Sequence, residues 1–432
     1  MAKRVRPSHA VTIYRVGGSV RDELLGRPVA DRDWVVVGAT PEMLIASGYR
    51  PVGRDFPVFL HPETHEEYAL ARTERKHGRG YRGFEFFVSP DVSLEEDLER
   101  RDLTINAMAR DEQGALIDPF GGARDLDARI LRHVSPAFAE DPLRVLRVAR
   151  FAARFGFVVA DETEALMRDI VASGELATLA PERVWSELSR GLMEAHPSRM
   201  LAVLRDCGAL ALLLPEVDAL FGVPQPIAHH PEFDAGIHTA LALDYAAKKG
   251  FRLPVRYAVL AHDLGKAASP PGNWPKHHGH EARSVRLATR LSERLKVPAE
   301  CRDIARLAAR WHGTVHRAQE LRASTLLDLI TAADALRRPE RLDRLLEACE
   351  CDALSRPGVA KVYPPRGIVR DALAVVKRVN AAAAVKGAGV KRKPRVGTTP
   401  ADAIGKRVRA LRLKALAEWR RARNDERPPQ TR

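Results

Sequence analysis

Two aspartates with one residue between them, Asp31 and Asp33, stand at the start of the apolar run 34–37. In a strand, alternate side chains point to the same face, so the two carboxylates are predicted to lie side by side. Like charges at that spacing are stabilised by a cation, and carboxylate oxygens are ligands that Mg²⁺ prefers. The pair therefore predicts a Mg²⁺ site, although a DxD pair alone is also typical of a solvent-facing turn.

A glycine-rich turn lies upstream of the aspartates. Gly17 and Gly18 follow the apolar run 13–16, and a short helix-compatible segment comes next. Glycines let the backbone approach a phosphate closely, and Arg21 can reach a phosphate from the first turn of that helix. The turn and the aspartates together favour a nucleotide site over a surface turn.

A helix is predicted over residues 140–155, where Pro142 suits the first helical position and Asp141 the cap. Its apolar residues recur at helical spacing as a buried face. They are Val145, Val148, Ala152 and Phe155. Arginines occupy another face, namely Arg144, Arg147 and Arg154, with Arg150 close by. An arginine stripe alone is typical of a solvated helix face.

A second set of chemical groups begins with His238 and continues with the adjacent pair His262 and Asp263, which follows an apolar run. Imidazole and carboxylate together suit a transition metal better than Mg²⁺. We assign Asp334, in the segment LLDLITAADA, as the fourth ligand. Other histidines nearby could serve a second metal, bind phosphate or support the ligands, and the last is favoured. They are His277, His278, His280 and His312.

The segments GGSVRD and DRDW resemble the nucleotidyltransferase signature of class II tRNA nucleotidyltransferases and their poly(A) polymerase relatives, in the polymerase-beta superfamily. The resemblance implies that Asp31 and Asp33 are catalytic and hold Mg²⁺. It also implies that Gly18 and Arg21 bind the nucleotide. The H…HD…D pattern resembles HD-domain metallophosphohydrolases, and full HD spacing favours ligation over core histidines.

Two more segments extend the resemblance. Residues 93–109, predicted to be helical with acidic first turns, contain an RRDxxxN arrangement like the family's ribose and phosphate element. This implies that Arg101 contacts phosphate and that Asp102 and Asn106 contact sugar hydroxyls. The EDPLR motif is similar to the element with which these enzymes read the incoming base, which implies that role for Asp141 and Arg144. Arg147 and Arg150 match arginines that complete the nucleotide pocket.

The segment GRDFPVFLH, residues 53–61, resembles the enzymes that build CCA ends, whereas poly(A) polymerases carry a more basic stretch there. The resemblance therefore implies addition of C, C and A to tRNA 3′ ends from CTP and ATP. For the HD domain it implies phosphatase, 2′-nucleotidase and 2′,3′-cyclic phosphodiesterase activities, often with Ni²⁺. Three alternatives are weaker. A poly(A) polymerase shares the head, but GRDFPVFLH and the HD domain argue against it; a stand-alone HD nucleotide hydrolase leaves Gly17 to Asp33 unused; and a non-catalytic RNA-binding protein gives no reason for two metal-ligand sets.

The expected fold class is α+β over 432 residues. A polymerase-beta-like nucleotidyltransferase head with a mixed sheet and helices is followed by an all-α neck, an all-α HD domain and a basic helical tail. The expected boundaries are 12–139, 140–225, 226–355 and 356–432.

Charge is concentrated at the end of the chain. Residues 361–432 hold 20 Lys and Arg against 5 Asp and Glu, which accounts for the whole net charge of +14. This indicates either a polyanionic partner, with tRNA as the candidate, or a solvated tail.

Compartment and assembly are also constrained by the sequence. No apolar stretch approaches the length of a membrane span, and the basic start MAKRVRPSH lacks the apolar segment of a signal peptide. The four cysteines form no CxxC pair and are expected to be reduced thiols. We expect a cytoplasmic protein without a membrane partner, as a monomer or a weak homo-oligomer.

Overall fold

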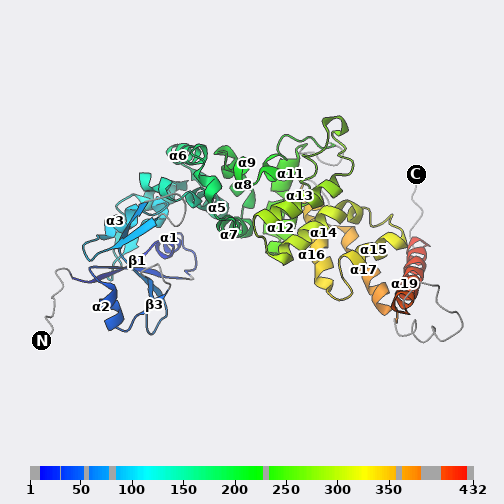
Figure 1. The fold of residues 1–432 in the computed structure, drawn as a ribbon, viewed down its shortest axis with the longest axis horizontal. Coiled ribbons are helices and arrows are strands. Elements are labelled where there is room, and N and C mark those ends of the chain that lie inside the picture. The colour runs from blue at the N-terminus through cyan, green and yellow to red at the C-terminus, as the bar shows by residue number, and fades with distance from the viewer. Residues whose placement is uncertain are drawn as a thin grey trace. The chain divides into compact units, whose positions relative to one another are not determined.

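The structure is a computed structural model that describes residues 10–29, 31–52, 58–76, 84–226, 233–356, 362–380 and 400–425. Contacts divide the chain into two compact units, Met1–Pro215 and Glu216–Arg432 (Figure 1). Residues 53–57 of the GRDFPVFLH segment, and most of the Gly- and Lys-rich stretch 385–400, lie outside the described ranges. Across those ranges, no helix combines the length and the apolar character that crossing a membrane requires.

The first unit is built on a seven-stranded sheet in which only β2 and β5 run parallel to each other. In spatial order its strands are β3 (Arg50–Val52), β4 (Val58–Leu60), β5 (Glu67–Leu70), β2 (Asp33–Val37), β1 (Thr12–Val16), β8 (Ala109–Arg110) and β9 (Leu116–Ile117). β-Branched and aromatic residues dominate β1 and β2, as strands favour. The register places Asp33 opposite Val16 on β1 and beside Glu67 on β5.

Two apolar clusters cover the two faces of this sheet. One contains Val16, Val35 and Leu98, and the other contains Val36 and Phe59. The alternation of Val35 and Val36 follows from the two-residue period of a strand. Because Asp33 and Val35 share a face, the carboxylate of Asp33 projects on the side of the first cluster, at the end of the strand.

The remaining elements of the first unit are short pairs of strands and helices. The strand pairs are β6 (Arg72–Lys76) with β7 (Phe84–Val88), and β10 (Ile130–Leu131) with β11 (Val158–Val159). The helices are α1 (Gly18–Leu24), α2 (Pro41–Ala46), α3 (Leu94–Glu99), η2 (Thr104–Asn106), α4 (Gly122–Ala128), η3 (Pro136–Glu140), α5 (Leu143–Phe155), α6 (Asp161–Ala172), η4 (Glu175–Thr178), α7 (Pro181–Met193), α8 (Pro197–Asp206) and α9 (Ala209–Leu213). The expected all-α neck therefore also contributes one short strand, β11.

The helix predicted over residues 93–109 is wrong in its second half. A capping box of Ser93 and Glu96 starts α3, as the acidic first turn suggested, but the helix ends at Glu99. The carboxylate of Asp102 then accepts hydrogen bonds from the backbone of Leu103 and from the side chain of Asn106. Such local bonds compete with helical ones, so the chain turns instead.

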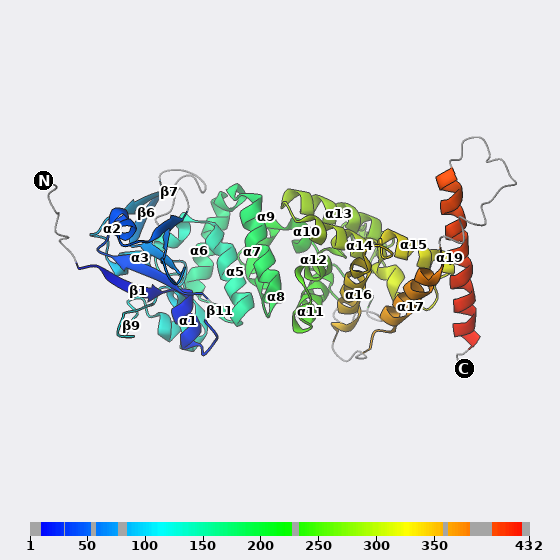
Figure 2. The ribbon, with the colours of Figure 1, turned by 90° about the horizontal axis from the view of Figure 1, so that it is seen from below.

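Helix α5 is the central helix beside the sheet domain, and α7 and α8 lie against it (Figure 2). Its predicted buried face is confirmed at Val145, Val148 and Ala152, while Phe155 is partly exposed. Pro142 takes the cap position, one residue earlier than predicted, and the Asp141 carboxylate accepts from the Leu143 amide. Packing on both sides fixes the direction in which the arginines of α5 project.

The described residues of the second unit form helices joined by turns and loops, with an isolated bridge between Pro224 and Asp234. Its elements are α10 (Pro215–Asp218), α11 (Ala235–Lys248), α12 (Leu253–Ala261), η5 (Pro271–Asn273), α13 (His280–Arg294), α14 (Ala299–His316), α15 (Ala323–Ala332), α16 (Pro339–Leu354), α17 (Pro364–Arg378) and α19 (Pro400–Asp425). Helices α12, α14 and α16 pack against one another, with α11 and α13 against them. All four cysteines are buried and free, as expected.

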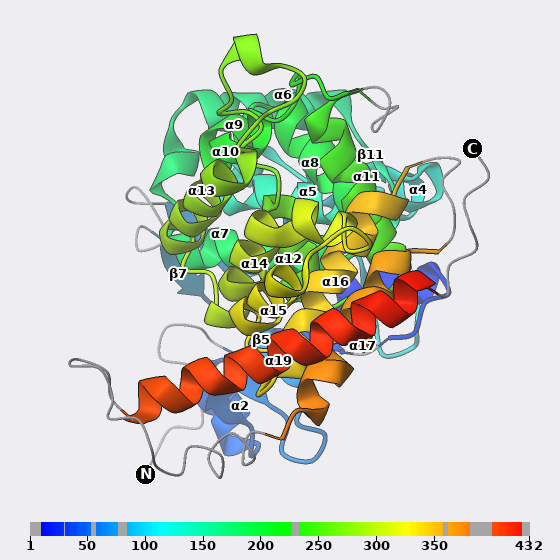
Figure 3. The same cartoon turned by 90° about the vertical axis from the view of Figure 1, so that its right-hand side faces the viewer.

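The last helix, α19, packs against other helices of the second unit. It lies against α15 and α17, and Figure 3 shows it running across the α17 side of its unit. Leu416 is fully buried in this contact, and Arg420 donates to the Leu321 and Gln319 carbonyls. The opposite face carries exposed cations, including Lys406 and Arg421.

Candidate functional site

The first unit contains a cavity of 590 Å³ where the β1–α1 turn, the segment 100–106 and the start of α5 meet. It brings together all nine residues predicted to bind the nucleotide, and also Asp33. The lining residues are Gly17, Gly18, Arg21, Asp33, Arg72, Arg100, Arg101, Asp102, Asn106, Asp141, Leu143, Arg144, Arg147, Arg150, Phe151, Arg154 and Arg183. Nine of these described residues are arginines and three are aspartates, so the cavity is strongly electropositive and suits a polyphosphate.

Gly17 sets the floor of the cavity. Its φ of +69° is in the left-handed region, and a Cβ there would lie 2.7 Å from an Arg101 guanidinium nitrogen. The backbone can therefore turn sharply from β1 into α1 while Arg101 passes directly over it. The glycine-rich motif predicted close approach of a phosphate, which stays a prediction; the group that lies close to Gly17 in the structure is the Arg101 guanidinium.

Asp33 begins β2 at the rim of this cavity, and Asp31 precedes it; both are exposed. Desolvation by the surrounding protein raises the pKa of Asp33, although part of the residue stays exposed. The positive charge of Arg101 lowers this pKa, and the negative charge of Asp31 raises it further. Two neighbouring carboxylates are a donor set that a divalent cation neutralises. Glu67 is the in-register neighbour of Asp33, so a third carboxylate lies at the same strand end.

Asp102 is the buried anchor of the cavity wall. Arg147 Nε lies 2.7 Å from one carboxylate oxygen, and Asn106 Nδ2 lies 2.9 Å from the other. Burial alone would raise the pKa of Asp102, but Arg147 and the hydrogen bonds outweigh it and lower the pKa to about 2. Asp102 therefore stays ionised and fixes the directions of Asn106 and Arg147.

Arg21 is held more tightly than a simple phosphate contact would need. It is buried, donates to the Asn106 side-chain oxygen, and lies 5.3 Å and 4.9 Å from the ring centres of Phe151 and Phe155. The rings keep the guanidinium in place by cation–π contact. Arg21 thereby links α1 to both the 102–106 turn and α5.

The predicted base-reading pair lies at the start of α5. Arg144 donates to the backbone carbonyls of Ala137 at 2.8 Å and Arg100 at 2.6 Å, which fixes the plane of its guanidinium. The Asp141 carboxylate accepts from Arg183 at 2.9 Å. Both groups line the cavity with set orientations, which is what reading one edge of a base requires.

The sequence analysis missed two residues of α7 that hold this wall. Arg183 contacts Asp141, and Glu187 accepts from Arg150 at 2.6 Å. The neck was given no chemical role, yet Arg183 and Glu187 are one helical turn apart and so share a face. The available signal in the sequence was that Glu187 recurs at helical spacing with the apolar Val184 and Leu188; in the structure its side is buried and Glu187 is 3% exposed.

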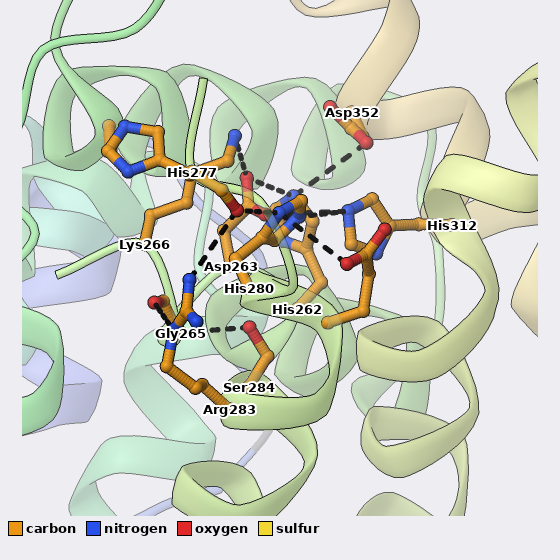
Figure 4. Close-up of polar contacts among 12 residues, drawn as sticks. His262, Asp263, Gly265, Lys266, His277, His280, Arg283, Ser284, His312 and Asp352 are labelled. Atoms are coloured by element: carbon orange, nitrogen blue, oxygen red, sulfur yellow. Dashed lines mark hydrogen bonds and ion pairs between the residues drawn. The ribbon is translucent and has the colours of Figure 1, made fainter. Parts of the chain in front are cut away.

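The second unit contains a buried group of three potential metal ligands, His238, His262 and Asp352. Figure 4 labels His262 and Asp352 of this group. They come from α11, the end of α12 and α16. His238 Nε2 lies 3.0 Å from one oxygen of Asp352, and His262 Nε2 lies 3.8 Å from the other. His262 Nδ1 donates to the Val259 carbonyl at 2.7 Å, so its Nε2 lone pair faces the group. Three lone-pair donors converge here, which fits a transition metal.

Asp263 adjoins this group, as the adjacent His-Asp pair predicted. One of its oxygens lies 3.1 Å from His262 Nε2 and 2.6 Å from Lys266 Nζ. Burial would raise the pKa of Asp263, but His262 and Lys266 outweigh it and hold the pKa well below its usual range. The carboxylate is thus ionised and available as a ligand.

The assignment of Asp334 to this site is wrong, and Asp352 takes its place. Asp334 follows α15 and forms ion pairs with Arg337 at 2.8 Å and Arg338 at 3.0 Å. These two pairs lower its pKa to about 2. Asp352 lies on α16 instead, where its pKa is held well below the usual range by His316 and His238 against the effect of burial.

A second group of potential ligands consists of Asp263, His280 and His312. The sequence analysis favoured a supporting role for the two histidines. His312 Nε2 and His280 Nε2 each lie 3.4 Å from the other Asp263 oxygen and 3.2 Å from each other. One oxygen of Asp263 therefore lies beside His262 of the first group, and the other lies beside His280 and His312.

Gly265 allows the helix that carries His280 to reach the centre. A Cβ on Gly265 would lie 2.2 Å from the His280 carbonyl oxygen and 2.5 Å from the Ser284 amide. Arg283 locks the contact by donating to the Gly265 carbonyl and to Ser269 (Figure 4). The glycine that follows the His-Asp pair thus has a packing role.

These sites match domains known in other proteins. The Poly A polymerase head domain family matches residues 13–132, a family described as the probable RNA and SrmB- binding site of polymerase A matches residues 156–221, and the HD domain family matches residues 230–356. The fold and sites thus define a polymerase-type nucleotidyltransferase head joined to an HD domain.

Curated relatives resolve the family further. The Multifunctional CCA protein of Nitrosomonas europaea is 63% identical over 372 residues, covering 86% of this chain and 90% of that protein. That of Burkholderia cenocepacia is 57% identical over 416 residues, covering 94% and 98%. The chain belongs to the family of multifunctional CCA proteins.

Solved structures share the fold at lower identity. The Bacillus stearothermophilus CCA-adding enzyme in complex with CTP matches with a TM-score of 0.61 at 24% identity, covering 97% of this chain and 96% of that one. The Thermotoga maritima CCA-adding enzyme complexed with tRNA matches with a TM-score of 0.57 at 21% identity, covering 96% and 92%. The expected α+β architecture is confirmed.

The corrected assignment predicts a difference between two isosteric variants. Asp352→Asn should weaken the binding of a divalent transition metal to the second unit by at least about tenfold, because it removes a charged ligand. Asp334→Asn should leave the affinity unchanged, and asparagine tolerates the φ of +54° at that position. Calorimetric titration of Ni²⁺ into each metal-free variant measures both. A loss of affinity in Asp334→Asn alone would contradict the correction.

Proposed function

We propose that this protein adds C, C and A to the 3′ ends of tRNA from CTP and ATP without a nucleic-acid template. The observation that carries the proposal is the electropositive cavity of the first unit, which gathers the nine predicted nucleotide-binding residues beside Asp33. The printed names of relatives that are about 60% identical support the same reaction.

In this proposal different residues of the cavity bind the triphosphate, contact the base and hold the metal ion. Arg101 and the Gly17–Gly18 turn bind the triphosphate, while Asp141 and Arg144 meet the base edge. Mg²⁺ on Asp31 and Asp33 would stabilise the negative charge on the entering 3′ oxygen and on the leaving pyrophosphate. Asp33 begins β2 and Asp31 precedes it by two residues, so that one ion would contact both proposed catalytic carboxylates.

For the second unit we propose metal-dependent phosphohydrolase activity, with His238, His262, Asp263 and Asp352 holding a transition metal, of which Ni²⁺ is the first candidate. Phosphate monoesters, 2′-nucleotides and 2′,3′-cyclic phosphates are the proposed substrates. Support comes from the HD domain match and from the convergence of imidazole and carboxylate lone pairs. A location in the cytoplasm agrees with a tRNA substrate.

A pair of variants tests whether the two centres are separate. Asp33→Ala should slow addition of C to tRNA that lacks its CCA end by a hundredfold or more, about 3 kcal/mol, and leave hydrolysis of 2′,3′-cyclic AMP intact. His262→Ala should do the reverse. Wild type incubated with CTP and ATP should stop after CCA, whereas a long A tail would favour the poly(A) polymerase alternative. Parallel loss of both activities in either folded variant would refute the separation.

Base selection is expected to depend on Arg144. Arg144→Ala should reduce the preference for CTP over UTP by about tenfold or more, because one well-placed contact gives about 1–3 kcal/mol of discrimination. Arg190→Ala is the control and should leave the preference unchanged, because Arg190 is exposed on α7 and does not line the cavity. Single-turnover incorporation of each nucleotide measures this, and an unchanged preference in Arg144→Ala would exclude it from base reading.

The exposed cations of α19 are proposed to contact tRNA phosphates. Replacing Lys406, Arg407 and Arg421 with Ala should flatten the slope of log affinity against log salt by about two, while buried Leu416 keeps the helix in place. Filter binding over a salt series gives the slope. Lines of equal slope for wild type and variant would mean that this face is only solvated.

A further inference from the structure

We propose that a cavity beside α14 in the second unit binds one nucleotide, with its terminal phosphate on Arg306 and Arg310 and its base on Trp311. The ligand is either a free nucleoside monophosphate or the phosphorylated end of an RNA chain. The proposal goes beyond both reactions proposed above and depends on neither. The described lining residues of this cavity do not overlap with those of the electropositive cavity of the first unit, and none is a potential metal ligand.

The cavity has a volume of 320 Å³ and lies where α14 meets α13, α16 and the end of α15 (Figure 3). Its described lining is half charged and half apolar. The charged residues are Asp303, Arg306, Arg310 and Arg341, and the apolar ones are Val285, Leu307, Trp311 and Ala332. Ligand pockets start at about 300 Å³ and combine an apolar wall with a few placed polar groups. This cavity therefore suits a ligand of about the size of one nucleotide.

Positive charge is in excess among these residues. Asp303 pairs with Arg341 at 3.2 Å, and the guanidinium groups of Arg306 and Arg310 form no ion pair or hydrogen bond with a described residue. The two arginines are one helical turn apart, where like charges destabilise a helix. A phosphate bound between them would replace this repulsion with charge-assisted hydrogen bonds.

The size of the excess indicates a terminal phosphate. Three arginines against one aspartate give the described lining a net charge of +2. A phosphate monoester carries a charge of about −1.5 to −2 at neutral pH. The ion pair of Asp303 with Arg341 joins α14 to α16, so the charged wall is fixed before a ligand arrives.

Trp311 gives the cavity an aromatic wall. Its side chain is partly exposed, and the guanidinium carbon of Arg310 lies 5.4 Å from the ring centre. Aromatic rings beside basic groups bind nucleotides because every base has a π face that stacks. Val285 and Leu307 extend the apolar wall. An inorganic anion would leave this wall unused, so the cavity favours a nucleotide over phosphate alone.

Equilibrium dialysis of AMP against the full-length protein in EDTA tests the proposal. The double variant Arg306→Gln and Arg310→Gln should bind AMP in this cavity at least about tenfold more weakly, and so hold one AMP fewer per chain at subsaturating ligand. The control with the same loss of charge is Arg286→Gln and Arg290→Gln, two exposed arginines of α13 that do not line the cavity. Equal AMP binding by the two double variants would overturn the proposal.

The base contact has its own test. Trp311→Leu should weaken AMP binding about tenfold and leave binding of inorganic phosphate unchanged, because only the base loses its stacking partner. Equal weakening of both would overturn the base contact. Photo-crosslinking of 8-azido-AMP to wild type needs no variant, and the labelled peptide should come from α14. Label confined to the first unit would overturn the proposal.

Competition identifies the source of the nucleotide. A short 5′-phosphorylated RNA should displace AMP from the control protein if the ligand is an RNA end, and the same RNA without its phosphate should not. Absence of displacement by either RNA would assign the cavity to free nucleoside monophosphates. Displacement by both RNAs alike would overturn the terminal-phosphate contact.

Discussion

Both centres of this protein depend on charge or lone pairs that neighbouring residues compensate only in part. In the first unit nine arginines surround one cavity with only three aspartates among its described lining residues. In the second, imidazole nitrogens and carboxylate oxygens meet at 3.0–3.8 Å within the core. Folding opposes such arrangements, because buried charge in excess of its partners raises the free energy of the native state. In the proposed function, a polyanionic nucleotide in one unit and metal cations in the other would relieve this excess.

Residues outside the proposed ligand contacts stabilise these two arrangements of charge and lone pairs. Asp102 holds Arg147, and Phe151 and Phe155 hold Arg21, so the cavity does not collapse onto its own charges. In the second unit, backbone carbonyls fix the histidine tautomers. His316 Nε2 lies 2.7 Å from an oxygen of Asp352, and His316 Nδ1 lies 2.7 Å from the Tyr363 hydroxyl. Tyr363 and His316 together therefore fix the orientation of the Asp352 carboxylate. Preorganisation of this kind is what distinguishes a binding site from a surface patch of the same composition.

Contiguous motifs were predictable from the sequence, and contacts between distant helices were not. The GGS turn before α1 and the adjacent His262 and Asp263 follow from the local sequence. The side-by-side placement of Asp31 and Asp33 assumed that both lie in one strand; β2 begins at Asp33, so Asp31 lies outside the strand and the placement stays a prediction. The fourth carboxylate was misassigned because Asp334 and Asp352 both follow apolar helical segments, and only the packing of α16 against α11 and α12 selects Asp352. Arg183 and Glu187 were missed for the same reason. The helix predicted over 93–109 failed where Asp102 binds its own neighbours.

The central claim, that two separate centres are each completed by their own counterion, is tested most directly by anomalous X-ray diffraction at the nickel edge. Crystals of the full-length protein would be soaked with CTP, Mg²⁺ and Ni²⁺. The account predicts nickel peaks among His238, His262, Asp263 and Asp352, and triphosphate density beside Asp33 and Arg101. Nickel peaks confined to Asp31 and Asp33, or triphosphate density absent from the arginine-lined cavity, would contradict it.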